Sequence, residues 1–172
     1  MRIIYVSGTM GDQDFNAYVK EAHTPINPSN QNFHYRFIKA LSLHTEVSAV
    51  SLRPFSAHMF DRDELSRRES FDNGVSFTYL ADKAGRLYRL FRRPHLLFKE
   101  LNKQIGKDDK NVLLIVDSLK YSLAKAAIRV AKKHKVPVIG VVSDNPFLLS
   151  NESKTYAQAV LSLAKQYDGF VA

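Results

Sequence analysis

The chain has 172 residues, of which 45% are hydrophobic and 24% are charged, and its formal net charge is +8. These values are typical of one globular domain with a full hydrophobic core. Because the chain contains no cysteine, disulfides, thiolate metal sites and a cysteine nucleophile are excluded. We expect a cytoplasmic protein, since the lack of cysteine fits a reducing compartment and no apolar run approaches the roughly 20 residues of a membrane span.

The chain begins with a strand, a loop and a helix. Residues 2–7 are an apolar run that predicts a buried strand. Residues 9–29 are polar and predict a long loop without regular structure, a length that is typical of functional or mobile segments. Residues 30–43, which follow Pro28, carry apolar side chains at helical spacing and predict the first helix.

Two further strands come next. Residues 46–52 alternate between apolar and polar side chains, and residues 75–80 form the third predicted strand. Between them, residues 53–73 predict a polar loop with a short helical turn. Asn73 and Gly74 are turn residues that end this loop.

A basic segment follows the third strand. Between residues 83 and 110 lie nine basic and three acidic residues, a net charge of +6. Its apolar stripe predicts a helix that Pro94 breaks or kinks near Arg93. The basic face is either a solvated surface or, with the aromatic residues beside it, a site of peripheral docking on an anionic membrane. Nucleic acid is not an expected partner, because no recognition motif is present. The predicted membrane-binding residues are Arg86, Arg89, Arg92, Arg93, Lys99 and Lys103.

The most regular pattern lies in residues 111–146. Two apolar runs, at residues 112–116 and 136–142, bracket a segment in which apolar side chains recur at helical spacing. This pattern predicts a right-handed βαβ unit in a parallel sheet that is covered on both faces. A helix at residues 154–166 and a strand at residues 168–172 complete the chain.

Together these elements predict an α/β fold. We expect a Rossmann-like, doubly wound parallel sheet of about six strands in the order 3-2-1-4-5-6, with helices on both faces. Residues 1–172 would form a single domain. Because the chain ends in an apolar strand, we expect it to be the first half of a two-domain protein.

Candidate site residues follow the central strands, because ligands of such sheets usually lie beyond the carboxyl ends of the strands. Residues 117–120, which include Asp117 and Ser118, follow the fourth strand, and residues 143–146, which include Ser143, Asp144 and Asn145, follow the fifth. Asp144 is the candidate catalytic residue, since a carboxylate there can orient or deprotonate a hydroxyl. The same residue types also suit a turn, and Asp117 also suits a helix cap.

The loop after the first strand does not carry a nucleotide-binding fingerprint. Residues 7–12 lack the Gly-x-Gly-x-x-Gly spacing, and no P-loop is present, so neither NAD nor ATP is expected there. Gly8 either forms a turn or allows the backbone to approach a phosphate. The six histidines are not spaced with carboxylates as metal ligands, and we expect no metal site.

The chain resembles the N-terminal domain of GT-B-type glycosyltransferases, in particular the retaining family 4 group. The likeness is carried by stretches spread over nearly the whole chain. These stretches are residues 2–8 (RIIYVSG), 28–33 (PSNQNF) leading to 37–41 (FIKAL), Asp117, Ala126 and Ala127 with 135–142 (KVPVIGVV), and 167–172 (YDGFVA).

The resemblance implies the acceptor-binding half of a two-domain enzyme that uses a nucleotide-sugar donor and is inactive without its second half. A missing C-terminal domain would bind the donor, and this domain would hold no cofactor. The acceptor would be a sugar or a lipid-linked molecule, with the protein peripheral at the membrane. Relatives often have His-Asp after the fifth strand, where this chain has Ser143 and Asp144. The implied substrate-binding residues are Gly8, Thr9, Asn32, Asp117, Ser118, Ser143, Asp144 and Asn145.

Two other functions stay open. The domain is alternatively a Rossmann-like or flavodoxin-like module that binds another nucleotide or small ligand. It is otherwise a non-enzymatic module that docks on a membrane or on another protein.

Overall fold

The computed structural model describes residues 1–85, 87–106, 109–144, 147 and 154–171. A seven-stranded sheet in the order β4-β5-β2-β1-β7-β8-β9 forms its centre, and β3 and β6 form a separate antiparallel pair. All neighbours in the large sheet are parallel except β4 and β5. The strands are β1 (Arg2–Ser7), β2 (Val47–Ser51), β3 (Glu64–Leu65), β4 (Arg68–Asp72), β5 (Val75–Tyr79), β6 (Asp82–Lys83), β7 (Val112–Asp117), β8 (Val138–Val141) and β9 (Gly169–Val171).

The mixed α/β class with a mostly parallel sheet is confirmed, but the strand count and order differ from the prediction. The added strand is β4, which lies at the sheet edge and pairs antiparallel with β5. Asn73 and Gly74 connect the two strands, and both have positive φ, 48° and 81°. This is the backbone that a two-residue hairpin favours. The sequence signalled the turn, but the charged and mostly exposed β4 carried no strand pattern.

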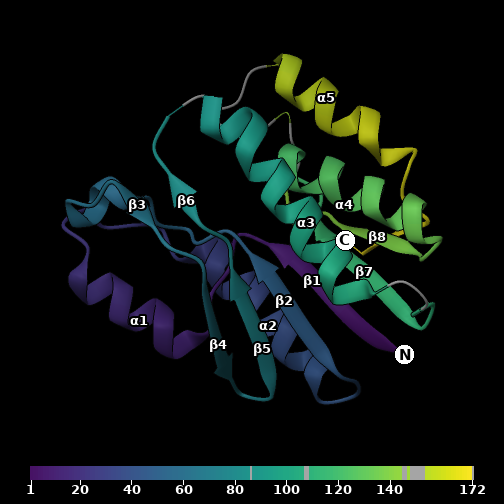
Figure 1. The fold of residues 1–172 in the computed structure, drawn as a ribbon, viewed down its shortest axis with the longest axis horizontal. Coiled ribbons are helices and arrows are strands. Elements are labelled where there is room, and N and C mark those ends of the chain that lie inside the picture. The colour runs from purple at the N-terminus through teal and green to yellow at the C-terminus, as the bar shows by residue number, and fades with distance from the viewer. Residues whose placement is uncertain (86, 107–108, 145–146, 148–153, 172) are drawn as a thin grey trace.

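Helices cover both faces of the sheet (Figure 1). On one face α1 and α2 contribute to a core with Phe15 and Ile38. On the other face α3, α4 and α5 contribute Leu101, Val130 and Leu163. A π-helical turn, η2, leads directly into α3 at Pro94, so the helix changes type where the proline stands. The helices are α1 (Asp12–Glu21), α2 (Ser29–Ser42), the 3₁₀-helix η1 (Ala57–Phe60), η2 (Tyr88–Arg92), α3 (Arg93–Ile105), α4 (Tyr121–His134) and α5 (Lys154–Ala164).

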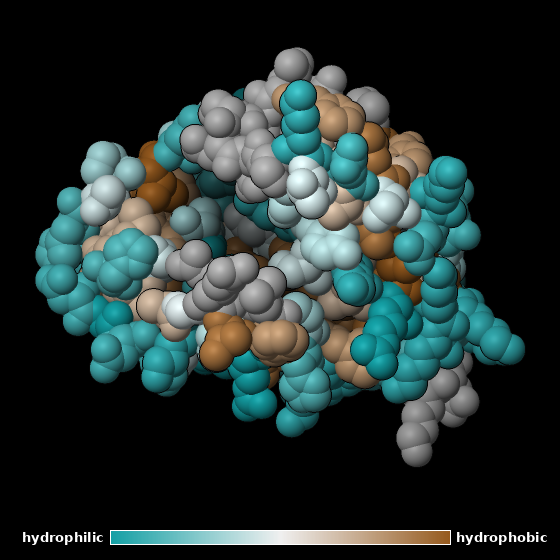
Figure 2. Space-filling model, turned by 90° about the horizontal axis from the view of Figure 1, so that it is seen from above, coloured by the Kyte–Doolittle hydropathy of each residue, from teal (hydrophilic) through white to brown (hydrophobic). Residues whose placement is uncertain are grey.

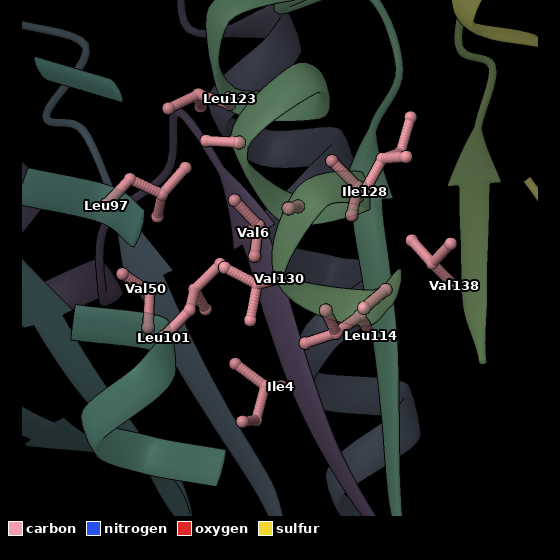
Figure 3. Packing of buried hydrophobic residues seen from close by; sticks show 14 of the residues in the cluster. Ile4, Val6, Val50, Leu97, Leu101, Leu114, Leu123, Ile128, Val130 and Val138 are labelled. Carbon is pink, nitrogen blue, oxygen red and sulfur yellow. The ribbon is translucent and has the colours of Figure 1, made fainter. Parts of the chain in front are cut away.

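Side chains alternate between the two faces of each strand, so the strands contribute to two hydrophobic cores, one on each face of the sheet. In β1, Ile4 and Val6 face α3 and α4, whereas Ile3 and Tyr5 face α2. Figure 3 shows the first of these cores, where Ile4 and Val6 meet side chains from the two helices. Each fully buried aliphatic side chain stabilises the fold by about 1.5–3 kcal/mol. The carboxyl ends of the central strands, where the candidate site lies, are therefore held in place by helices packed on both faces of the sheet.

Residues 9–29 contain helix α1, so the prediction of a loop without regular structure was wrong. The residue before the helix is Gly11, which offers no side chain to cap it. The cap comes instead from Asp72 at the end of β4, whose Oδ2 accepts a hydrogen bond from the Asp12 amide at 2.6 Å. The Tyr79 hydroxyl accepts from the Gly11 amide at 3.0 Å and donates to Asp14 at 2.8 Å. The local signals are Asp12 and Asp14 in the first turn and Lys20 in the last, but the capping partners lie some sixty residues away.

Replacing Asp72 with alanine should destabilise the domain. The change removes the cap of α1 and the acceptor of the Tyr35 hydroxyl, 3.0 Å away. We expect a loss of about 1–3 kcal/mol in the free energy of unfolding, measured with urea. Asp63→Ala, at an exposed carboxylate, is the control and should change stability by less than about 0.5 kcal/mol. Equal stability of the two variants would contradict the capping role.

Candidate functional site

A cavity of about 390 Å³ opens at the carboxyl ends of β1, β2 and β7. The chain leaves β1 toward β2 on one side, while β7 lies on the other side. This is the switch point at which parallel sheets bind their ligands. Figure 2 shows the molecule from above, with a hollow near the middle of this face.

Five segments contribute to the cavity wall. Gly8 follows β1, Lys120 follows β7, and the loop after β2 runs along one side. The start of α2 and the β6–α3 connection complete the wall. The residues are Gly8, Asn27, Asn30, Gln31, Leu52, Arg53, Pro54, Phe55, Ser56, Asp82, Arg93, Lys120 and Leu123.

The loop after β1 is fixed by the side chain of Gln31, which is 2% exposed. Its Oε1 accepts hydrogen bonds from the Met10 amide and from the Thr9 hydroxyl, each at 2.8 Å. Its Nε2 donates to the Met10 carbonyl at 2.8 Å. Thr9, a predicted substrate-binding residue, is fully buried in this arrangement. Gln31 thus holds the backbone that presents Gly8 to the cavity.

Gly8 leaves space that a side chain would occupy. A Cβ at this position would lie 3.7 Å from Cε of Lys120 and 3.8 Å from the Leu52 carbonyl oxygen. These are ordinary van der Waals distances, so a larger residue would narrow the cavity without a backbone clash. The functional interpretation of Gly8, as a place where a ligand approaches the backbone, is compatible with this geometry.

Arg53 is the buried cation of the cavity, at 6% exposure. Its Nη1 donates to the Leu80 carbonyl at 3.1 Å and its Nη2 to the Ser66 carbonyl at 2.5 Å, whereas Nε has no partner. The guanidinium also lies 5.4 Å from the ring centroid of Tyr79. Burial lowers the pKa of Arg53, but an arginine remains charged at neutral pH.

The other charges of the cavity are one ion pair and one free cation. Arg93 donates hydrogen bonds to Asp82 from Nε and Nη2, at 2.6–2.8 Å, and the two charges compensate each other. Lys120 is exposed, and within the described ranges its ammonium has neither an ion-pair nor a hydrogen-bond partner. Together with Arg53, Lys120 gives the cavity a net positive charge.

Asp117 and Ser118 lie at the end of β7, but both are buried. Oδ2 of Asp117 lies 3.2 Å from Nε2 of His34, without hydrogen-bond alignment. Nδ1 of the same His34 lies 2.7 Å from the Tyr5 hydroxyl, and burial, followed by the charge of Asp117, raises the pKa of Tyr5. The Ser118 hydroxyl donates to the Val141 carbonyl at 2.7 Å. These contacts join β1, α2, β7 and β8 beneath the cavity.

The remaining predicted substrate-binding residues that the structure describes lie outside the cavity wall. Asp144 is exposed and Ser143 half-buried on the segment after β8. Asn145 lies outside the described residues. Asn32 is exposed on α2, and its amide donates to the Pro28 carbonyl at 2.8 Å. Of the predicted substrate-binding set, only Gly8 lines the cavity, and the role of Asp144 stays a prediction.

The predicted membrane-binding residues do not form one uniform face. Arg92, Lys99 and Lys103 are exposed, whereas Arg93 is held by Asp82. Arg86 and the side chain of Arg89 lie outside the described part of the structure.

Of the apolar stripe in the same segment, one part is buried and one part is exposed. Leu97 and Leu101 belong to the core, while Leu87 and Phe91 are 73% and 70% exposed.

Two residues of the cavity, Arg53 and Gln31, were missed from the sequence, whereas Lys120 lies in the candidate segment 117–120 after β7. Arg53 directly follows the strand predicted at residues 46–52, which is the signal that could have identified it. Gln31 offered no such signal, because its partners Thr9 and Met10 lie in a segment predicted to be an unstructured loop.

Neither a metal site nor a membrane span is found in the described part of the chain. No three His, Asp or Glu side chains there are grouped to hold a metal ion. Among the described helices, none has the length and apolar character needed to cross a bilayer.

Comparison with known proteins does not identify a function for the cavity. No model of a protein family matches the chain, and neither a curated protein nor a solved structure matches it. The residues of the cavity and their surroundings therefore carry the functional argument.

Replacing Gln31 with leucine should loosen the loop after β1. The variant keeps a side chain of similar size but leaves the buried Met10 amide and carbonyl without partners. We expect a loss of about 2–4 kcal/mol in the free energy of unfolding and faster hydrogen exchange at the Met10 amide. Gln13→Leu, at an exposed position of α1, is the control. Unchanged protection of the Met10 amide would contradict the role given to Gln31.

Proposed function

We propose that this chain is the acceptor-binding half of a sugar-nucleotide-dependent glycosyltransferase and is inactive on its own. The observation that carries the proposal is the cavity at the carboxyl ends of β1, β2 and β7, with Gly8 in its wall. Amide side chains, the Ser56 hydroxyl and the Asp82–Arg93 pair also line it. Such groups suit the many hydroxyls of a sugar, which both donate and accept hydrogen bonds.

The charges in the cavity support the view that a second domain supplies the donor side. Asp82 is the carboxylate in the wall, and Arg93 already binds both of its oxygens. A general base needs a carboxylate that is free to accept a proton from the substrate. Asp144 is a candidate for that role, since it is exposed and follows β8 at the same edge of the sheet.

The proposed partners follow from this assignment. A C-terminal domain would bind the nucleotide sugar, and the acceptor would be a sugar or a lipid-linked molecule. The Rossmann-like sheet is equally able to present the cavity to another nucleotide or small ligand. Binding measurements with sugars and with nucleotides separate these two functions.

Gly8→Val should block acceptor binding without unfolding the domain. The added methyl groups would enter the cavity beside Lys120 and the Leu52 carbonyl. Titration of simple sugars, followed by NMR, should shift the amides of Gly8, Arg53 and Lys120 in the unmodified chain only. Gly169→Ala is the matched control, because its new methyl group meets no atom within 4 Å. Sugar transfer or donor hydrolysis by these 172 residues alone would refute the proposed half-site.

A second candidate function, docking on an anionic membrane, is favoured by one surface feature. Leu87 and Phe91 are exposed about one helical turn apart, and they border an open surface hollow with Tyr88, Arg92 and His95. Exposed apolar side chains beside a cation are typical of interfacial binding. On this proposal the protein is cytoplasmic and peripheral at the membrane.

Leu87→Ser combined with Phe91→Ser should abolish binding to anionic vesicles. Each serine removes an apolar side chain that would enter the lipid interface, while the hydrophobic core stays intact. Cosedimentation with vesicles that contain phosphatidylserine measures the effect. Leu43→Ser, which is 77% exposed at the end of α2, should bind like the unmodified chain. Equal binding to neutral and anionic vesicles would exclude this function.

A further inference from the structure

The start of α2 lies in the cavity wall and has amide groups without acceptors in the described part of the chain. This 14-residue helix has no side-chain cap and no acidic residue in its first turn. The Ser29 amide donates to Oδ1 of Asn27 at 2.9 Å. The amides of Asn30 and Gln31 find no acceptor among the described residues, and both residues line the cavity. A helix start of this kind carries partial positive charge and favours an anion.

Arg53 gives an independent reason to expect an anion. Among the described residues, most buried carboxylates lie beside a basic side chain, and Asp72 instead binds the Asp12 amide and the Tyr35 hydroxyl. The pairs are Asp14 with Arg68, Asp82 with Arg93, Glu100 with Arg67 and Asp117 with His34. Arg53 is buried, yet no carboxylate of the described chain pairs with it, and its Nε is unpartnered. A buried charge without a counter-charge is costly, and a bound anion would compensate it.

Lys120 adds a second cation to the cavity wall. It follows β7, and its Cε lies 3.7 Å from the position that a Cβ of Gly8 would take. The ammonium therefore lies beside the gap that the missing Gly8 side chain leaves. Its lack of an ion-pair partner within the described ranges leaves its charge available to a ligand.

We propose that the cavity binds the phosphoryl group of a phosphorylated sugar, held by Arg53, Lys120 and the free amides at the start of α2. A phosphate dianion matches two cations and several N–H donors better than a neutral hydroxyl or a single carboxylate does. The inference rests on the proposed function in one respect, namely that the phosphorylated molecule is the acceptor. It then assigns a phosphosugar as the acceptor class.

The binding experiment compares three ligands by calorimetry with the 172-residue chain. The ligands are a hexose, the corresponding hexose 6-phosphate and a nucleoside diphosphate. We expect the hexose phosphate to bind at least about tenfold more tightly than the hexose, as one or more charge-assisted hydrogen bonds would give. Its affinity should fall below about pH 6, where the phosphate dianion gains a proton.

Lys120→Gln tests the contact directly, because this exposed side chain holds no part of the fold together. The variant should bind the hexose phosphate about tenfold more weakly. Lys125→Gln, which makes the same charge change at an exposed position of α4, should leave the affinities for hexose and for hexose phosphate unchanged.

The remaining outcomes separate the two proposals. Equal affinity for hexose and hexose phosphate would overturn the phosphoryl site and leave the acceptor function standing. Tighter, Lys120-dependent binding of the nucleoside diphosphate would overturn the phosphosugar acceptor, because the phosphate would then belong to the donor. Binding of none of the three ligands, or phosphate binding that Lys120→Gln leaves unchanged, would overturn the phosphoryl site as built here.

Discussion

The paired hydrogen bonds between the Gln31 side chain and the Met10 backbone connect the sheet, the helices and the cavity. Beyond the end of β1, the Gln31 side chain takes the place of a neighbouring strand. It accepts a hydrogen bond from the Met10 amide and donates one to the Met10 carbonyl. Buried backbone groups need such partners. The contact fixes the direction in which the chain continues into α1, and it anchors the start of α2 against the same loop. Gly8, which lies just before the loop, therefore occupies a defined place in the cavity wall.

The distribution of buried charge follows from this framework. Beneath the cavity, Asp117 and His34 are fully buried beside each other and link α2 to β7. In the wall, Arg93 neutralises Asp82. Arg53 differs from these pairs, because carbonyl oxygens and aromatic rings surround it in place of a carboxylate. A cation of this kind is desolvated when the domain folds, so its position need not change when a ligand binds.

Features that depend on local pattern could be predicted from the sequence, and features that depend on distant partners could not. The apolar strands β1, β7 and β8 and the amphipathic α4 follow from periodicity, and so does the parallel sheet that they build. Helix α1 is held by Asp72 of β4 and by Tyr79 of β5, and the mostly exposed β4 has no strand pattern of its own. The same division applies to the site. Its location at the carboxyl ends of the strands was predictable, and Arg53 could have been found from its place directly after a strand. Gln31 is recognised only by its neighbours in space.

The capping of α1 by Asp72 also constrains the order in which the domain can form during synthesis. The ribosome releases the α1 segment about sixty residues before the carboxylate that starts the helix. An isolated ten-residue helix is marginal in water, so the segment has little reason to persist as a helix before the β4–β5 hairpin has formed. Contacts of such long sequence separation form late and slow the folding of a domain. The amino-terminal part of this protein therefore depends on its middle part, and its α1 segment reaches its final conformation only after later residues have been made.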